Sequence, residues 1–396
     1  MVRSNTDPEL YAYSRGLMVR LAALRQQAPD ALSYDVVKGV EEFQRFYQHI
    51  ESRGLVERFG VANIDAEGRP LDADAAHFFR FYVEPFADEC LNAPDPLHAS
   101  DELLPHLEQS LEAKHAIWSV ISPLCRFSTD CAPVVLPNDV SIVGLADDAK
   151  RHAIESVGNG QALLLGLTSA QFALHTTRDE PKGVPSLVAP PEFDRTVTAL
   201  RLLKPGAASH PLVSHRLEYP RFGTPSPLGF AGDVWSPAAA VLGTDYTLAP
   251  QDVPDLVALL SAHWPAVHGR ADLALTRFDY AYERARPEDR LIDLWVALEA
   301  LFLGREEQQE LAYRAALRVA HFVEAPGAAR ERAFREVKRS YSDRSKVVHG
   351  DRASGDVGQT VEYLESVLRK ALRKVVVSGA TPELKRLDGQ IARGET

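Results

Sequence analysis

Apolar residues recur at helical spacing through most of the last third of the chain, between 251 and 378. Proline and glycine punctuate this pattern. Pro287 suits the first turn of a helix, and Gly350 suits a helix end. The pattern predicts five helices, over 273–284, 288–303, 311–323, 328–349 and 359–377. Because the connections are short, neighbouring helices are expected to pack antiparallel in a bundle.

The first third of the chain also holds few helix breakers. Its apolar spacing predicts four helices, over 9–27, 35–52, 72–91 and 101–120. Between 126 and 250 proline and glycine become frequent, and short apolar runs alternate with turn residues. These runs predict strands at 134–136, 140–143 and 162–167, and a helix at 147–157. The run 193–203 is compatible with a strand but favours a helix.

The predicted fold is therefore mainly α, with a small α/β region in the middle. We expect a helical N-terminal region over 1–125 and a loop-rich α/β region over 126–250. A helical bundle over 251–378 and a polar, weakly ordered tail over 379–396 should follow. The length of 396 residues is enough for two or three domains with cores of their own.

Composition narrows the function. A net charge of −11 argues against constitutive, non-specific binding to nucleic acid. Cys90, Cys125 and Cys131 form neither a disulfide framework nor a zinc motif. The chain has no glycine-rich phosphate loop, and no cofactor or metal is predicted. The sequence contains neither a membrane-length apolar run nor an apolar signal segment at its start, so a cytoplasmic protein without membrane contact is expected.

Charge is unevenly spread along the chain. Between 328 and 350 there are seven Lys or Arg against three Asp or Glu, on one predicted helix. Such a helix is either a solvated face or a local phosphate-binding surface on an otherwise acidic protein. The sequence leaves both interpretations open.

The same helix ends in YSDRSKVVHG, residues 341–350. Arg344 offers a planar fork of donors that suits phosphate, and His349 can accept or donate a proton near neutral pH. Their five-residue spacing places them about 140° apart on an ideal helix, on opposite flanks of an expected apolar stripe. That stripe comprises Phe334, Val337, Tyr341 and Val348. One helix is thus a poor clamp for a phosphate, whereas two helices about a two-fold axis would suit it.

Three segments in order carry a family resemblance: RLIDLWVALEALF at 290–302, RAALRVA at 314–320, and the YSDRSKVVHG end. Together they resemble the Apea-like branch of the HEPN superfamily over residues 270–377. The resemblance implies an all-α bundle that dimerises. It also implies a metal-independent ribonuclease of bacterial defence, toxin–antitoxin or abortive-infection systems, which leaves a 2′,3′-cyclic phosphate.

Mapped onto this chain, the resemblance implies that His349 transfers the proton and that Arg344 holds the scissile phosphate. Ser345, Lys346 and Arg339 are expected to contact the RNA. Ser345 departs from the Asn, Asp or His common after the family's arginine, and some members are silent interaction modules.

Glu299 lies in an otherwise apolar helix, where a carboxylate needs a partner. That partner is either Arg344, which Glu299 would orient, or a structural arginine such as Arg314 or Arg318. Trp295 is expected in the core and Asp293 at the surface.

The expected partners are RNA as substrate, a second copy of the chain, and an antitoxin or a trigger molecule sensed by the N-terminal region. The alternative is a catalytically silent HEPN dimer that binds a protein or RNA.

Overall fold

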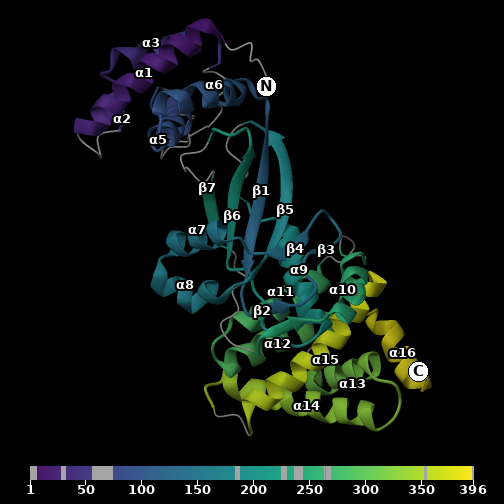
Figure 1. Cartoon of the computed structure of the whole chain (residues 1–396). Helices are drawn as coiled ribbons and strands as arrows, with labels where there is room; N and C mark the ends of the chain where they lie inside the picture. Colours follow the sequence, from purple (N-terminus) through teal and green to yellow (C-terminus); the bar gives the residue numbers. More distant parts are fainter. Residues whose placement is uncertain are drawn as a thin grey trace. The chain divides into compact units, whose positions relative to one another are not determined.

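The computed structural model describes most of the chain (Figure 1). The described residues are 7–27, 33–55, 75–182, 188–223, 230–235, 244–262, 264, 269–304, 306–307, 309–351 and 355–394. They form two compact units. One unit comprises 1–121, 175–188 and 213–234, and the other 122–174, 189–212 and 235–396.

The first unit begins with helices, as predicted. Helix α1 spans Pro8–Gln27 and matches the expected helix there. The expected helix at 35–52 is interrupted, because Gly39 separates α2 (Tyr34–Val37) from α3 (Glu41–Ser52). The helices enclose a core rich in phenylalanine.

Proline shapes the next helical segment. It runs through α4 (Ala75–Phe78), a π-helical stretch (Phe79–Val83) and α5 (Glu84–Leu91). Pro85 has no backbone N–H to continue the α-helical ladder, which accounts for the wider turn just before it. The predicted helix at 72–91 is confirmed from 75 onward, and 72–74 lie outside the described residues.

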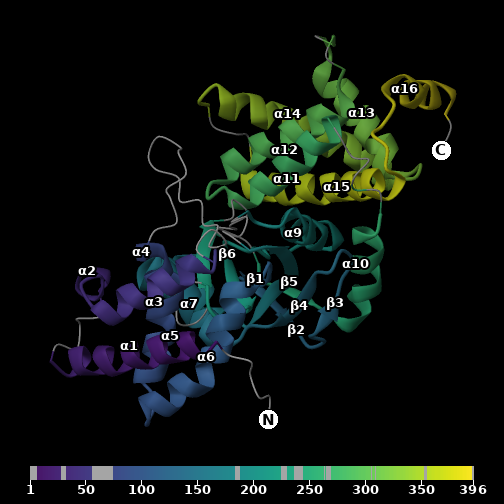
Figure 2. The ribbon, with the colours of Figure 1, turned by 90° about the horizontal axis from the view of Figure 1, so that it is seen from above.

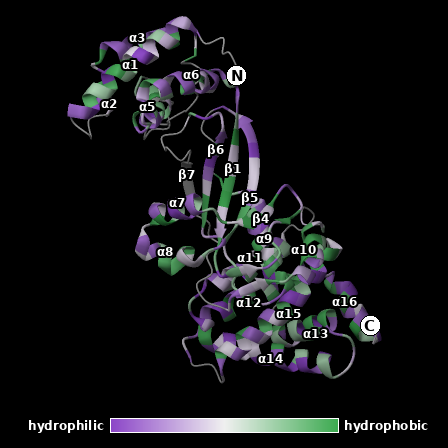
Figure 3. Cartoon of the chain, viewed as in Figure 1, coloured by the Kyte–Doolittle hydropathy of each residue, from purple (hydrophilic) through white to green (hydrophobic). Residues whose placement is uncertain are grey.

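The predicted helix at 101–120 is wrong in its second half. Helix α6 (Pro96–Glu112) starts at Asp95, whose carboxylate accepts from the backbone of Leu97 and His98. The chain then enters strand β1 (His115–Leu124). The β-branched and aromatic residues of β1 favour a pleated strand and outweigh the helical spacing. Figure 3 shows how hydrophobic this strand is.

A six-stranded sheet has the strand order β3-β4-β5-β1-β6-β7. The other strands are β3 (Val134–Val135), β4 (Ser141–Gly144), β5 (Phe172–Pro181), β6 (Leu212–Tyr219) and β7 (Phe230–Trp235). Antiparallel register pairs Ile117 of β1 with Tyr219 of β6, and Val134 of β3 with Ile142 of β4. A separate parallel pair joins β2 (Phe127–Thr129) to β8 (Tyr246–Leu248).

Helices of the middle region follow the prediction with one exception. Helices α7 (Asp147–Val157) and α9 (Pro191–Leu203) confirm two expected helices. The strand expected at 162–167 is wrong, because α8 (Asn159–Leu165) occupies that position and ends at Gly166 in the left-handed conformation. Leu164 is 87% exposed there, so this apolar run is not a buried strand.

The second unit contains a helical bundle, seen from two directions in Figures 1 and 2. Its helices are α11 (Arg270–Glu283), α12 (Pro287–Phe302), α13 (Leu311–Val323), α14 (Ala328–Val348) and α15 (Val357–Ser378). Helix α12 packs against the other four. It is central because its apolar residues point in most directions, and Trp295 is fully buried, as expected. Helix α10 (Val253–Leu260), which was not predicted, packs on α9.

The tail is more ordered than expected. Residues Leu384–Arg393 form α16, which packs on α13. Arg318 of α13, 2% exposed, donates to both carboxylate oxygens of Asp388 at 2.7 Å. The same guanidinium donates to Glu307 and to the carbonyl of Phe302. This ion pair and the burial of Leu387 hold α16 in place.

The chain is thus mainly α-helical with a small sheet. Within the described ranges, no helix is both long and apolar enough to cross a membrane.

Candidate functional site

The motif helix α14 ends in a defined cap. His349 is the C-cap residue, and Gly350 adopts a φ of 83°, which a side chain rarely permits. The N–H of Gly350 donates to Val347 and that of Asp351 to Lys346, which is the Schellman pattern. The predicted helix end at Gly350 is therefore confirmed, and the cap fixes the position of the His349 backbone.

The buried face of α14 differs from the expected apolar stripe. It consists of Ala333, Val337, Ser340 and Asp343. Of the stripe residues, Val337 is buried, but Val348 is 50% exposed. Helix packing tolerates small and paired polar residues on the inward face, so hydrophobicity alone misplaced that face. The rotation turns Arg344 toward the bundle.

Arg344 is held between two residues of the bundle. Its guanidinium nitrogen lies 3.8 Å from Oε1 of Glu299, and its guanidinium carbon lies 6.0 Å from the centre of the Tyr341 ring. Tyr341 in turn meets Trp295 edge to face, at 5.0 Å between ring centres. Among the residues that the structure describes, the Nε of Arg344 is buried without a hydrogen-bond partner. The side chain as a whole is 25% exposed, so its terminal nitrogens are the donors open to an oxyanion.

Glu299 pairs with Arg344 rather than with a structural arginine. Arg318 and Arg314 instead bind Glu307. Burial raises the pKa of the Glu299 carboxyl above its usual value, and the charge of Arg344 opposes that rise. The contact anticipated between Glu299 and Arg344 is present at ion-pair distance.

His349 is exposed and lies apart from Arg344. No hydrogen bond or ion pair joins the two side chains among the described residues. Five residues of α-helix separate them by about 140° and ~7.5 Å of rise. One copy of the chain thus supplies the arginine and the histidine on different faces, as the spacing predicted.

The other expected RNA contacts lie along the last three turns of α14. Arg339 is exposed, with Glu336 at 3.9 Å, and its guanidinium approaches Gly355. Ser345 and Lys346 are half-buried and accept the capping hydrogen bonds through their carbonyls.

A hollow of about 600 Å³ adjoins the end of α14 on another side. Its lining includes three carboxylates, from Glu288, Asp289 and Asp351, and one guanidinium, from Arg286. Neither Arg344 nor His349 lines it. A concentration of carboxylates is unsuited to a phosphate, so this hollow is not the expected substrate site.

Sequence reasoning missed the buried ion pairs of the bundle. Asp293, expected at the surface, is 3% exposed and binds Arg277 at 2.9 Å and Arg284 at 2.7 Å. A buried carboxylate needs such partners to offset desolvation. The sequence around Asp293 gave no signal, because Arg277 lies on the preceding helix α11 and Arg284 lies at the end of that helix.

A second buried network joins α9, α11 and α15. Arg201 is fully buried and binds Asp279 at 2.9 Å. Glu365 accepts from Arg369 at 2.6 Å and from the Tyr282 hydroxyl at 2.5 Å. These residues are far apart in sequence, so only the fold brings them together.

The middle region holds a Ser–His–Asp arrangement that the sequence did not reveal. The Oγ of Ser122 lies 3.3 Å from Nδ1 of His210, whose Nε2 lies 2.9 Å from Asp194. Ser122 and His210 are both fully buried, and the Ser122 hydroxyl donates to the carbonyl of Leu212 at 2.7 Å. A nucleophile needs access to substrate and a base for its proton. This arrangement lacks that access, and its hydroxyl proton is already bound, so we interpret it as structural.

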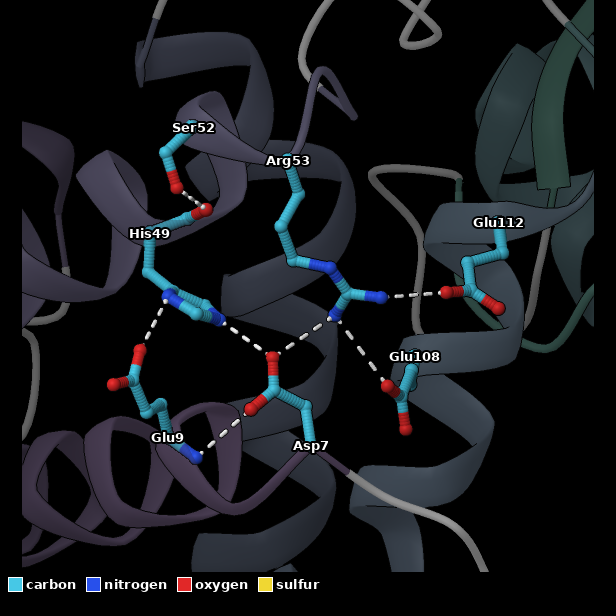
Figure 4. Close-up of polar contacts among 7 residues, drawn as sticks. All are labelled: Asp7, Glu9, His49, Ser52, Arg53, Glu108 and Glu112. Carbon is cyan, nitrogen blue, oxygen red and sulfur yellow. Dashed lines mark hydrogen bonds and ion pairs between the residues drawn. The ribbon is translucent and has the colours of Figure 1, made fainter.

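The N-terminal helices carry a further polar cluster, drawn in Figure 4. His49 lies 2.8 Å from Asp7 and 3.3 Å from Glu9 through its two ring nitrogens. Arg53 binds Asp7 and, at 2.7 Å, Glu112. The cluster joins α1, α3 and α6. Carboxylates outnumber cations in it, so it does not suit a phosphate.

Comparison with models of known families, with curated proteins and with solved structures yielded no match. The resemblance to the HEPN superfamily stays a prediction from the segments at 290–302, 314–320 and 341–350.

Proposed function

We propose that this chain is a HEPN-type, metal-independent endoribonuclease that acts as a homodimer. The observation that carries the proposal is the end of α14, where Arg344 is half-buried against Glu299 and His349 is exposed. A bundle of five consecutive helices, with the motif at the end of the fourth, is compatible with the fold that the resemblance implies.

In the proposed reaction His349 takes the proton of a ribose 2′-hydroxyl. The 2′-oxygen then attacks the adjacent phosphorus, and the bond from phosphorus to the 5′-oxygen breaks. The products are a 2′,3′-cyclic phosphate and a 5′-hydroxyl, whose oxygen takes a proton from water, while His349 returns its proton to the solvent. Arg344 stabilises the charge on the phosphoryl oxygens in the transition state, and Glu299 orients its guanidinium.

The active site is composite in this proposal. Arg344 and His349 face different directions on one helix, so a single copy does not clamp a phosphate between them. Two α14 ends related by a two-fold axis would place Arg344 beside His349 of the partner subunit.

The biological setting follows from the family resemblance alone. We place the enzyme in bacterial defence, as a toxin of a toxin–antitoxin pair or an abortive-infection effector. Its activity would be released by a trigger or restrained by an antitoxin, with the region before 251 as the regulatory part.

A cleavage assay tests the proposal. Purified full-length chain is incubated with total RNA in a metal chelator, and new 5′ ends are tested for direct labelling by polynucleotide kinase. We expect cleavage that leaves 5′-hydroxyl ends and that is lost in Arg344→Ala and in His349→Ala. His98→Ala and Arg45→Ala serve as controls, because both residues lie exposed on helices elsewhere. Intact RNA with the wild-type chain, or equal cleavage by His349→Ala, would count against the proposal.

The alternative is a silent HEPN dimer that binds a protein or RNA. Two observations favour it: Ser345 follows the arginine, and Glu299 lies close enough to neutralise Arg344. In that case the chain binds its partner but cleaves no RNA, and neither Arg344→Ala nor His349→Ala alters the result of the cleavage assay.

A further inference from the structure

The outward face of α14 concentrates positive charge on a chain whose net charge is −11. Five cations fall within an arc of about 120° on this helix: Arg332, Arg335, Lys338, Arg339 and Lys346. All are exposed or half-buried. His349 falls in the same arc at the helix end, and Glu331 lies in it near the helix start. We call this surface the basic face.

Aromatic rings border the basic face on the side of α13. Tyr313 is 46% exposed, and its ring meets that of Phe334 edge to face at 5.5 Å. The ammonium of Lys338 lies 5.6 Å from the centre of the Tyr313 ring and 5.8 Å from that of Phe334. An exposed ring beside an ammonium pairs a stacking surface with a phosphate contact.

We infer that the basic face binds single-stranded RNA, with a base stacked on Tyr313 and phosphates on Lys338 and Arg335. Lys338 lies eleven residues before His349, so the two are about 16 Å apart along the helix axis. That distance spans a few nucleotides of an extended strand. The inference rests on the proposed function, because it supplies the path by which substrate reaches His349.

Stacking on Tyr313 selects a single strand over a duplex. Bases within an A-form duplex are stacked on one another, and their faces are not accessible to a protein ring. The ring of an unpaired base is accessible for stacking, and the cations of the basic face contact the phosphates of the same strand. An acidic peptide would pair with the cations equally well, but it has no base to stack on the exposed ring of Tyr313.

Binding is measured by fluorescence anisotropy with labelled oligouridine of about 12 nucleotides and with a duplex of equal length. The full chain carries His349→Ala, so that the probe stays intact. We expect Tyr313→Ala to weaken single-strand binding between about fivefold and a hundredfold, and Tyr313→Phe to restore it. Lys338→Ala should reduce the steepness of the plot of the logarithm of the binding constant against the logarithm of the salt concentration by about 0.7. Glu331→Gln should strengthen binding.

Two controls match these changes. Tyr11→Ala removes a tyrosine exposed to 38% on α1, and Lys385→Ala removes an exposed charge on α16. Both should bind as the parent does. Thermal unfolding of every variant identifies any that fail to fold, in which case Tyr313→Ser and Lys338→Gln replace them.

The inference is overturned if Tyr313→Ala binds the single strand as tightly as the controls do. Preference for the duplex, or equal competition by a polyglutamate peptide, would overturn it too. Failure of the proposed function is recognised separately, as absence of cleavage by the wild-type chain. Single-strand binding that depends on Tyr313 would then persist without cleavage.

Discussion

Arg318 offers the sharpest test of how this bundle is held together. All five of its N–H donors are used, by Asp388, Glu307 and the carbonyl of Phe302. Substituting Arg318→Met keeps an apolar stem of similar length and removes the charge. Asp388 then loses this cation, and Glu307 keeps only its contact with the exposed Arg314.

Two estimates of the cost agree. The hydrogen bonds from Arg318 are the main cause that lowers the pKa of Glu307 from 4.5 to about 2. At ~1.4 kcal/mol per unit the whole shift corresponds to about 3 kcal/mol of stability at neutral pH, and Arg318 accounts for the larger part of it, since Gly304 and Arg314 also lower this pKa. Breaking a buried ion pair by removing one partner costs about 3–5 kcal/mol. Because the Asp388 side chain is 50% exposed, we expect the lower end of that range.

The assay is urea unfolding of the full chain, followed by circular dichroism from about pH 7 down to about pH 2. The folded-state pKa of Glu307 is depressed, so its stabilisation is present above its ordinary pKa and is lost as the pH falls toward 2. The difference between wild type and Arg318→Met should therefore shrink over that window. Trypsin should also cleave α16 faster in the variant.

Arg314→Met is the matched control. Arg314 also contacts Glu307, at 3.2 Å, but its side chain is 44% exposed. Exposed pairs contribute about 0–1 kcal/mol, so this variant should unfold nearly as the wild type does. Equal losses in the two variants, or a loss from Arg318→Met that does not depend on pH, would refute the reasoning.

Three further outcomes are expected. If the site is composite, mixing Arg344→Ala with His349→Ala chains should restore about a quarter of wild-type cleavage, because half the dimers are mixed and each regains one site; no restoration would place the site within one chain. Burial raises the pKa of Glu283 to about 7. In urea unfolding, Glu283→Gln should therefore become more stable than wild type as the pH rises from about 4.5 to above 7. A gain over wild type that is confined to acid pH would contradict this. Ser122→Ala should cost about 1–3 kcal/mol in the same assay, because the buried carbonyl of Leu212 loses its donor. A fluorophosphonate that labels wild-type Ser122 would show that the serine is accessible after all.

The sequence predicted the C-terminal helices closely because their ends are set locally. Pro287 at a first turn and Gly350 at an αL cap act through their own backbone restrictions, which need no tertiary partner. The same holds for the spacing of Arg344 and His349, since helix geometry alone separates their faces. The contact of Arg344 with Glu299 was one of two alternatives, and only packing decided between them.

Features that depend on distant residues were not predictable. The sequence of β1 predicts a helix, and only its pairing with the distant β6 makes it a strand. Asp293 is predicted at the surface, and only the two arginines that bind it allow its burial. The buried face of α14 was misjudged for a related reason. Ser340 and Asp343 face inward there, which hydropathy does not anticipate.

The strand order also bears on how the chain folds during synthesis. Strand β1 pairs with β6, whose residues lie roughly 100 positions later, whereas α11 to α15 pack mostly on sequence neighbours. At about 5–20 residues per second, β1 leaves the ribosome on the order of ten seconds before its partner. Its other neighbour in the sheet, β5, is synthesised sooner, but until then Trp118 and Val120, buried in the finished protein, have no strand to pair with. The nascent chain therefore passes through a stage in which this largely buried central strand is unpaired and needs protection from aggregation.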